Sequence, residues 1–238
     1  MAKGPAGTIA RWLLTAATLA VVFTTLHTYE NSADRARHDE RLYFPSGEFL
    51  VESSLGFREV MADWLWFRFI QYYGAYKNGE NDLRYLDSLI DSVVRLDPKF
   101  TKAYYLASFI YWSDFGRFDD AYDILKRGIL YNPDNAGLRF QIGFMHYVLD
   151  HDYTRAAHWF EMAGRCSDAT DRETRFAAFA RHKAGDDSVS LALWRDLLES
   201  TNSDQMRQLA EKMIDKLNRR VKFRAQFGDQ FIGPIPEL

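Results

Sequence analysis

Histidine and cysteine are common zinc-binding side chains, and this chain offers few of them. It has six histidines and one cysteine, at His27, His38, His146, His151, His158, His182 and Cys166. Zinc-binding helices place two histidines four residues apart with a glutamate nearby, and no pair here has that spacing. A single cysteine excludes an internal disulfide and a cysteine-based zinc cluster. The sequence therefore predicts no metal site and no cofactor.

A carboxylic acid with a raised pKa can protonate a glycosidic oxygen, and Glu52 is the candidate for this role. Glu52-Ser53 precedes an aromatic-rich helix and resembles the catalytic Glu-Ser of lytic transglycosylases. The resemblance implies a cell-wall glycosidase. The Gly-Leu-Met-Gln stretch that follows in that family is missing here, and the chain has no room for the family's catalytic domain. The glycosidase is kept as an alternative, and Glu52 is favoured as a linker or N-cap residue.

Asp114-Phe115-Gly116 resembles the triplet that holds magnesium in protein kinases. No glycine-rich loop, lysine-bearing strand or His-Arg-Asp motif accompanies it. Glycine permits the backbone turn expected between two helices at this point. We interpret the triplet as a turn, assign no catalytic residue and predict that the protein is not an enzyme.

The overall charge also limits the class of partner. The 238 residues include 30 Lys and Arg against 33 Asp and Glu, a net charge of −3. This balance argues against a nucleic-acid partner, because such proteins present an excess of cations to phosphate. With 47% hydrophobic and 26% charged residues, the composition is that of a folded chain.

An apolar segment lies near the start of the chain. Residues 12–26 carry no charge, and with the flanks from Ile9 to Tyr29 the segment reaches about 20 residues, enough to cross a bilayer core. No small-residue cleavage pattern follows it, so we expect residues 1–29 to be a retained signal anchor, a transmembrane helix. The two sides of the apolar segment carry nearly equal numbers of Lys and Arg, so the positive-inside rule alone does not decide its orientation. The usual arrangement of a signal anchor then places the remainder on the periplasmic or extracytoplasmic side of the inner or plasma membrane.

The rest of the chain repeats with a period of about 35 residues. Six positions are followed 35 residues later by a side chain of the same class. They are Tyr105, Trp112, Phe118, Ala121, Leu125 and Gly128, which match Phe140, Tyr147, Tyr153, Ala156, Phe160 and Ala163. Apolar residues within 102–114 recur every three or four positions, as in a helix with one buried face. Each repeat is therefore a helix hairpin that must stack on its neighbours to bury its apolar side.

The spacing resembles the tetratricopeptide repeat (TPR), whose helix pairs recur at about 34 residues. The resemblance is clear over residues 102–165 and extends to 67–101 and 168–201. It implies an all-α, TPR-like α-solenoid of three to four hairpins. Residues 203–217 have the pattern of an amphipathic C-terminal capping helix. The central units are one residue longer than the family repeat, and Phe109 replaces a small residue.

The family register also implies a concave groove that binds peptides or protein elements. Its expected lining residues on the first helix of each repeat are Ile110 and Asp114, Gln141 and Met145, and Arg172, Arg175, Phe179 and His182. Two arginines and a histidine suit an acidic or C-terminal carboxylate ligand. A register error of one residue would rotate each of these side chains by about 100°.

These observations predict four domains and a function. The domains are an anchor over 1–29, a linker over 30–54, a repeat domain over 55–224 and an extended tail over 225–238. The expected function is a membrane-anchored scaffold that binds protein partners in the assembly or maintenance of an envelope or membrane complex. The alternatives are a stoichiometric structural subunit of a membrane machine (secretion, pilus, transporter or respiratory) and the glycosidase built on Glu52.

Overall fold

The computed structural model describes residues 17–18, 20–25 and 47–227. The chain divides into two compact units, Met1–Phe44 and Pro45–Leu238. The helices of the second unit are α2 (Gly47–Ser53), α3 (Arg58–Lys77), α4 (Leu86–Leu96), α5 (Thr101–Asp114), α6 (Phe118–Tyr131), α7 (Ala136–Met145), the π-helix η1 (His146–Asp150), α8 (Tyr153–Gly164), α9 (Asp171–Lys183), α10 (Asp187–Ser200) and α11 (Asp204–Phe227). No β-strand occurs among the described residues, which confirms the all-α class.

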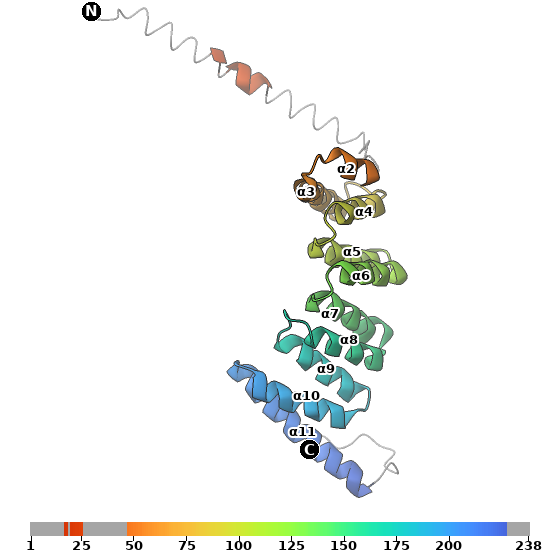
Figure 1. Cartoon of the computed structure of the whole chain (residues 1–238), viewed down its shortest axis with the longest axis vertical. Coiled ribbons are helices and arrows are strands. Elements are labelled where there is room, and N and C mark those ends of the chain that lie inside the picture. The colour runs from red at the N-terminus through yellow and green to blue at the C-terminus, as the bar shows by residue number, and fades with distance from the viewer. Residues whose placement is uncertain (1–16, 19, 26–46, 228–238) are drawn as a thin grey trace, which may run out of the picture. The chain divides into compact units, whose positions relative to one another are not determined.

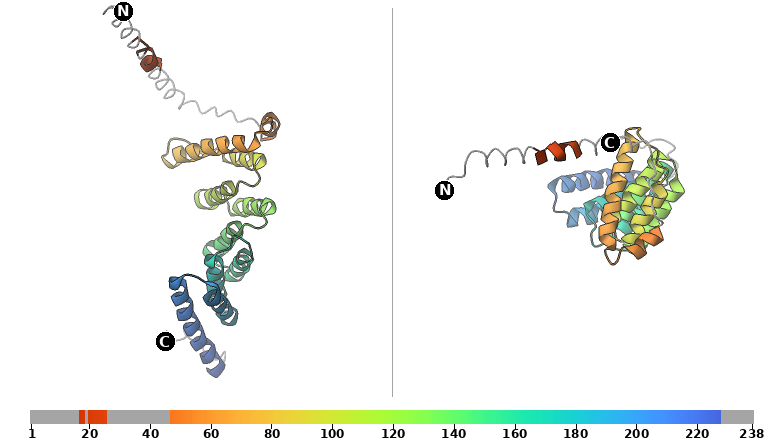
Figure 2. Two further views of the ribbon diagram at one scale, coloured as in Figure 1. Left: turned by 60° about the vertical axis from the view of Figure 1, so that its left-hand side comes forward. Right: turned by 90° about the horizontal axis from the view of Figure 1, so that it is seen from above.

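The helices of the second unit form a stack of helix hairpins. The pairs α3–α4, α5–α6, α7–α8 and α9–α10 pack internally, and each hairpin contacts the next in chain order. Figure 1 and the left-hand view of Figure 2 show this succession. The final helix, α11, packs on α10. The four hairpins and the last helix agree with the predicted repeats and capping helix.

Small residues allow the two helices of a hairpin to approach closely. A Cβ atom built at Gly128 would lie 2.8 Å from Tyr104 Cγ, and one at Gly143 would lie 2.8 Å from Phe160 Cδ1. Both distances are shorter than a van der Waals contact, so any larger residue would force the helices apart. Leu125 and Phe160 occupy equivalent positions in their hairpins, and both are fully buried.

The extra residue of the two central repeats lies in the connection between their helices. In the α5–α6 hairpin, Gly116 adopts a left-handed φ of +64°, and the Arg117 amide donates to the Tyr111 carbonyl. In the α7–α8 hairpin, the first helix ends in η1, whose wider turn accommodates one more residue. The connection is completed by His151 at φ +53°. The expected turn at Asp114-Phe115-Gly116 is thus confirmed.

The C-terminal cap is fixed by both apolar and ionic contacts. Ala210 and Leu217 of α11 are fully buried in a cluster with Trp194. The Asp187 carboxylate, which is 3% exposed, lies 3.4 Å from Arg220 Nε and 3.1 Å from Arg224 Nη1. Because α11 runs through Phe227, the expected domain boundary at 224 falls inside a helix.

The structure also corrects part of the expected linker over 30–54. Its last residues form α2, which packs on α4. Most of the expected anchor over 1–29 and most of the expected tail over 225–238 lie outside the described residues. Over the ranges that are described, no helix is long and apolar enough to span a membrane.

Candidate partner-binding surface

The first helices α5, α7 and α9 lie next to one another and present aromatic side chains on one face. On α5 these are Tyr105, Phe109 and Trp112, and 35 residues later they are Phe140 and Phe144 on α7 and Tyr147 on η1. The spacing of four and then three residues places each trio on one side of its helix. We call these six residues, with Arg172, Arg175, Phe176 and Phe179 of α9, the first-helix face.

Contacts between the helices join this face into one surface. Phe140 of α7 lies edge-on to Phe176 of α9, with ring centroids 5.1 Å apart. Arg172 of α9 lies over the Phe140 ring at 4.1 Å. Phe109 is 42% exposed, and the other aromatic residues of the face are half-buried. The aromatic rings of this face are therefore packed by neighbouring side chains and remain partly accessible to solvent.

Two of the expected lining residues do not reach any surface. Ile110 and Met145 are fully buried in the core, so the prediction was wrong for both. One residue earlier on each helix, Phe109 is exposed and Phe144 is half-buried. A shift of one residue corresponds to a rotation of about 100° around the helix. Gln141 is half-buried beside the face.

Asp114 is engaged by a neighbouring repeat. Its carboxylate accepts hydrogen bonds from Tyr73 Oη at 3.0 Å and Lys77 Nζ at 2.9 Å, both on α3. Burial acts to raise the pKa of this carboxyl, but hydrogen bonds from Lys77, Ser113 and Tyr73 outweigh burial and lower the pKa. Asp114 thus links the first two hairpins.

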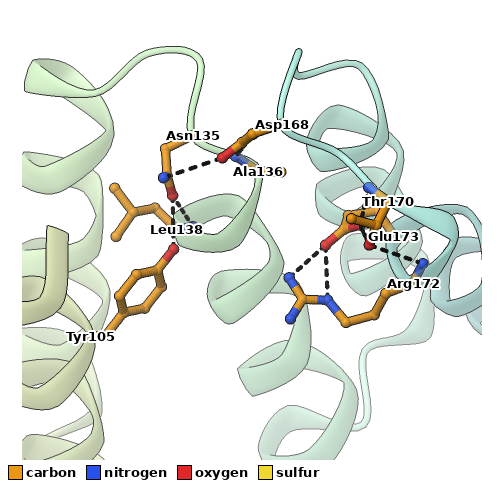
Figure 3. Close-up of polar contacts among 8 residues, drawn as sticks. All are labelled: Tyr105, Asn135, Ala136, Leu138, Asp168, Thr170, Arg172 and Glu173. Carbon is orange, nitrogen blue, oxygen red and sulfur yellow. Dashed lines mark hydrogen bonds and ion pairs between the residues drawn. The ribbon is translucent and has the colours of Figure 1, made fainter.

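Arg172 is ordered by internal contacts. Its Nε and Nη2 atoms donate to Glu173 Oε1 at 2.8 and 2.6 Å, as Figure 3 shows. The Glu173 side chain is 1% exposed, and it completes a capping box with Thr170. Burial tends to raise the Glu173 pKa, but the hydrogen bonds from Thr170 and Arg172 lower it. The charge of Arg172 is therefore balanced within the chain.

A polar ladder fixes the relative position of α5 and α7 at one edge of the face (Figure 3). The Tyr105 hydroxyl donates to Asn135 Oδ1 at 2.7 Å, and the same oxygen accepts the Leu138 amide at 2.9 Å. The Ala136 amide donates to Asp168 Oδ1 at 2.7 Å. Burial raises the pKa of Tyr105 to about 12. The hydroxyl thus remains a proton donor, and the N-terminus of α7 is held against its neighbours.

Arg175 has different surroundings from Arg172. Within residues 47–227 no carboxylate lies within ion-pair distance of Arg175, and its guanidinium lies 5.4 Å from the Phe176 ring centroid. Phe179 packs edge-on against Trp194 at 5.0 Å. The His182 ring is half-buried, and its Nδ1 lies 2.6 Å from Asp187 Oδ1, so this side chain joins α9 to α10. Arg175 is thus a cation with no carboxylate partner within residues 47–227, next to half-buried aromatic side chains.

The other candidate groups show no assembled chemical site. Glu52 is exposed on α2. Burial raises the pKa of the half-buried Cys166 thiol, which disfavours the reactive thiolate. In the part of the chain that the structure describes, no three His, Cys, Asp or Glu side chains are grouped to hold a metal ion.

Comparison with solved structures finds similar helical proteins. The chain is similar to two crystal structures of MamA, both at 14% identity and TM-score 0.40; the alignments cover 65% and 68% of this chain and 96% and 93% of those chains. It is also similar to PilW, described as a widely conserved type IV pilus biogenesis factor, at 17% identity and TM-score 0.41 over 66% of this chain and 76% of that one. No family model matches the sequence, and no curated protein is similar to it.

Proposed function

We propose that this protein is a membrane-anchored helical-repeat adaptor that holds an acidic segment of a partner protein against the first-helix face. Residues 1–29 attach it to the inner or plasma membrane, and the repeat domain lies on the extracytoplasmic side. The partner belongs to an envelope or membrane complex that the adaptor helps to assemble or maintain.

The observation that supports this proposal is that Arg175, within an aromatic surface, has no carboxylate partner among residues 47–227. Aromatic residues and arginine are the types most enriched where proteins bind one another. The guanidinium can form two parallel hydrogen bonds with a carboxylate, and the Phe176 ring, 5.4 Å from the guanidinium, provides apolar contact beside it. Attachment at the membrane raises the local concentration of any partner in the same bilayer.

The test is photo-crosslinking in intact membranes. A benzoylphenylalanine at Phe144 should crosslink to a defined partner, and the same group at the exposed His158 of α8 should not. Arg175→Glu should weaken capture of that partner by about tenfold or more, the range of an interface arginine. Arg195→Glu is the matched control, because Arg195 is exposed on α10 and not on the first-helix face. Equal capture by both variants would contradict the proposal.

The glycosidase alternative is separable by a single variant. Glu52→Gln should leave partner capture unchanged, because Glu52 lies on α2 and outside the first-helix face. Loss of a cell-wall hydrolysis activity in this variant, with the fold preserved, would instead favour the enzyme.

A further inference from the structure

A row of large apolar side chains is exposed at the start of the repeat unit. The exposed fractions are 87% for Leu55, 68% for Phe57, 63% for Val60, 54% for Trp64 and 60% for Phe67. We call these five residues the terminal stripe. Phe57 through Phe67 follow the spacing of one helical face, so the side chains form a continuous ridge along α3.

The terminal stripe is distinct from the face that α3 contributes to the core. The core side of α3 is formed by Ala62, Leu65, Phe69 and Tyr72, all buried. The stripe lies on the opposite side of the helix. Within residues 47–227, α2 and α3 are at one end of the hairpin stack, and no further hairpin lies beyond them (Figure 1). Phe57 and Val60 line an open cavity with Tyr131 of α6 and the connection after α4. Trp64 and Phe67 are exposed.

The other end of the stack is built differently. The outer positions of α11 are polar and exposed, and they include Arg207, Glu211, Lys212, Asp215 and Lys216. A stacked-repeat protein needs a polar outer face at each end to stay soluble on its own. The C-terminal end meets this requirement and the N-terminal end does not, so the terminal stripe is suited to an apolar environment.

The charges beside the stripe indicate what kind of environment this is. Arg58 and Arg68 are balanced by Glu59 and Asp63, all four exposed. The Arg68 guanidinium lies 5.9 Å from the Trp64 ring centroid, with its charge at the border of the apolar ridge. Aromatic residues flanked by charges of both signs suit the boundary between lipid headgroups and acyl chains. The absence of net positive charge favours neutral lipid as much as anionic lipid.

The chain length outside the described helices is compatible with a bilayer as the occupant. The apolar segment ends at residue 26, and α2 begins at Gly47. The twenty residues between them span at most about 70 Å when fully extended. A bilayer that holds residues 1–29 therefore stays within reach of α3.

We propose that the terminal stripe inserts into the surface of the bilayer and orients the repeat domain, so that the first-helix face is presented at a fixed height above the lipid. This inference rests on the membrane attachment in the proposed function. Apolar and aromatic burial drives the insertion, with no requirement for anionic lipid.

The test uses the full chain with a single spin label. Cys166 is the only cysteine, so Cys166→Ser gives a background to which Phe67→Cys adds one labelling site. Val221→Cys is the matched control, because Val221 is also an exposed apolar residue but lies on α11. Each labelled protein is reconstituted into phosphatidylcholine vesicles, and circular dichroism verifies the fold. Accessibility to oxygen, which concentrates in lipid, is compared with accessibility to a water-soluble nickel chelate.

We expect the ratio of oxygen to nickel accessibility to be severalfold higher at position 67 than at position 221, and to be unchanged when phosphatidylglycerol is added. Equal ratios at the two positions, or a dependence on phosphatidylglycerol, would overturn the proposal. A label at 67 that is shielded from both reagents and broadened by a neighbouring label would identify a second copy as the occupant, which also overturns it.

Flotation and carbonate extraction separate this inference from the anchor. If the protein floats and resists extraction but its label at 67 is in water, the membrane anchor is supported and the insertion of the terminal stripe is contradicted. If the protein is extracted while its label at 67 is in lipid, the insertion of the terminal stripe is supported and the membrane anchor is contradicted. Protein that does not float contradicts both.

Discussion

The third and fourth hairpins use the same second-helix register and differ in how their first helices end. Phe160 of α8 and Trp194 of α10 occupy corresponding positions, and both are fully buried. In the fourth hairpin, α9 ends in a short turn with Gly185 at φ +89°. In the third hairpin, α7 continues into the π-turn of η1 before α8 begins. The extra residue is therefore absorbed between the helices, and the packing of the second helix is unchanged.

This difference determines which side chains each first helix presents. On α9, Arg175 and Phe179 are both half-buried and lie four residues apart. On α7 the residues 35 positions earlier are Phe140 and Phe144, both half-buried and packed against the cluster around Phe160. Gln141 is also half-buried and Met145 is buried, so the α7 part of the face is mainly aromatic.

The largest predicted effects come from the shared core position. Phe160→Ala and Trp194→Ala should each lower the free energy of unfolding by about 3–5 kcal/mol, the usual cost of truncating a buried aromatic residue. Denaturant unfolding followed by circular dichroism measures both losses. Similar losses would support an equivalent core role for Phe160 and Trp194. A loss under about 1 kcal/mol at one site would show that the two positions are not equivalent.

A smaller effect is expected from filling the close approach in the third hairpin. The new methyl of Gly143→Ala would meet Phe160 Cδ1 at 2.8 Å and the Ala156 carbonyl oxygen at 3.2 Å. We expect a loss of about 1–3 kcal/mol, typical of overpacking. Gly164→Ala is the control, because its nearest neighbour would be Thr174 Oγ1 at 3.6 Å, an ordinary contact. A Gly143 variant as stable as the control would show that the helices can separate without cost.

The hairpins could be predicted from the sequence because the residues that recur at the repeat spacing are the buried ones. Ala121, Leu125, Ala156 and Phe160 recur at one spacing, and all four are fully buried. Which first-helix residues face the surface was harder to predict. The length of a repeat shows that it has one extra residue, but it does not show where in the repeat that residue lies. The one signal was Phe109, a large residue at a position expected to be small, which the structure places on the surface.

The sequence analysis also missed the pairing of Arg172. Arg172 and Arg175 look equivalent in the sequence, but Arg172 donates to the buried Glu173 and Arg175 has no carboxylate partner among residues 47–227. The Thr170-x-x-Glu173 pattern that marks a capping box could have identified this difference.

The capping box of the fourth hairpin gives a titratable contribution to stability. The folded-state pKa of Glu173 is lowered, so its contribution is present above the unfolded pKa and is lost as the pH falls through the folded pKa. Glu173→Gln should cost about 1–2 kcal/mol near neutral pH, the range of a lost cap. The difference from the natural protein should shrink as the pH is lowered below about 4.3, the usual glutamate pKa. Unfolding curves across this range test it, with the exposed Glu211→Gln as control. A difference independent of pH would contradict the assignment.

The smallest effect is expected at the π-turn itself. Asp150 Oδ2 accepts a hydrogen bond from Tyr122 Oη at 2.8 Å and lies 2.6 Å from His146 Nδ1. Burial, together with the hydrogen bond to Asp150, raises the pKa of the Tyr122 hydroxyl, which therefore stays a donor. Asp150→Asn keeps the shape and removes the charge, at a cost of about 1 kcal/mol.

If η1 opens independently of the helices around it, the stability lost in Asp150→Asn is confined to the turn. Amide hydrogen exchange over residues 146–152 should then accelerate roughly fivefold, the equivalent of about 1 kcal/mol, and exchange in α9 should stay the same. Acceleration throughout both hairpins would instead mean that the inserted residue is part of one cooperative unit with them. In that case the third hairpin accommodates the longer repeat only by coupling it to the fourth.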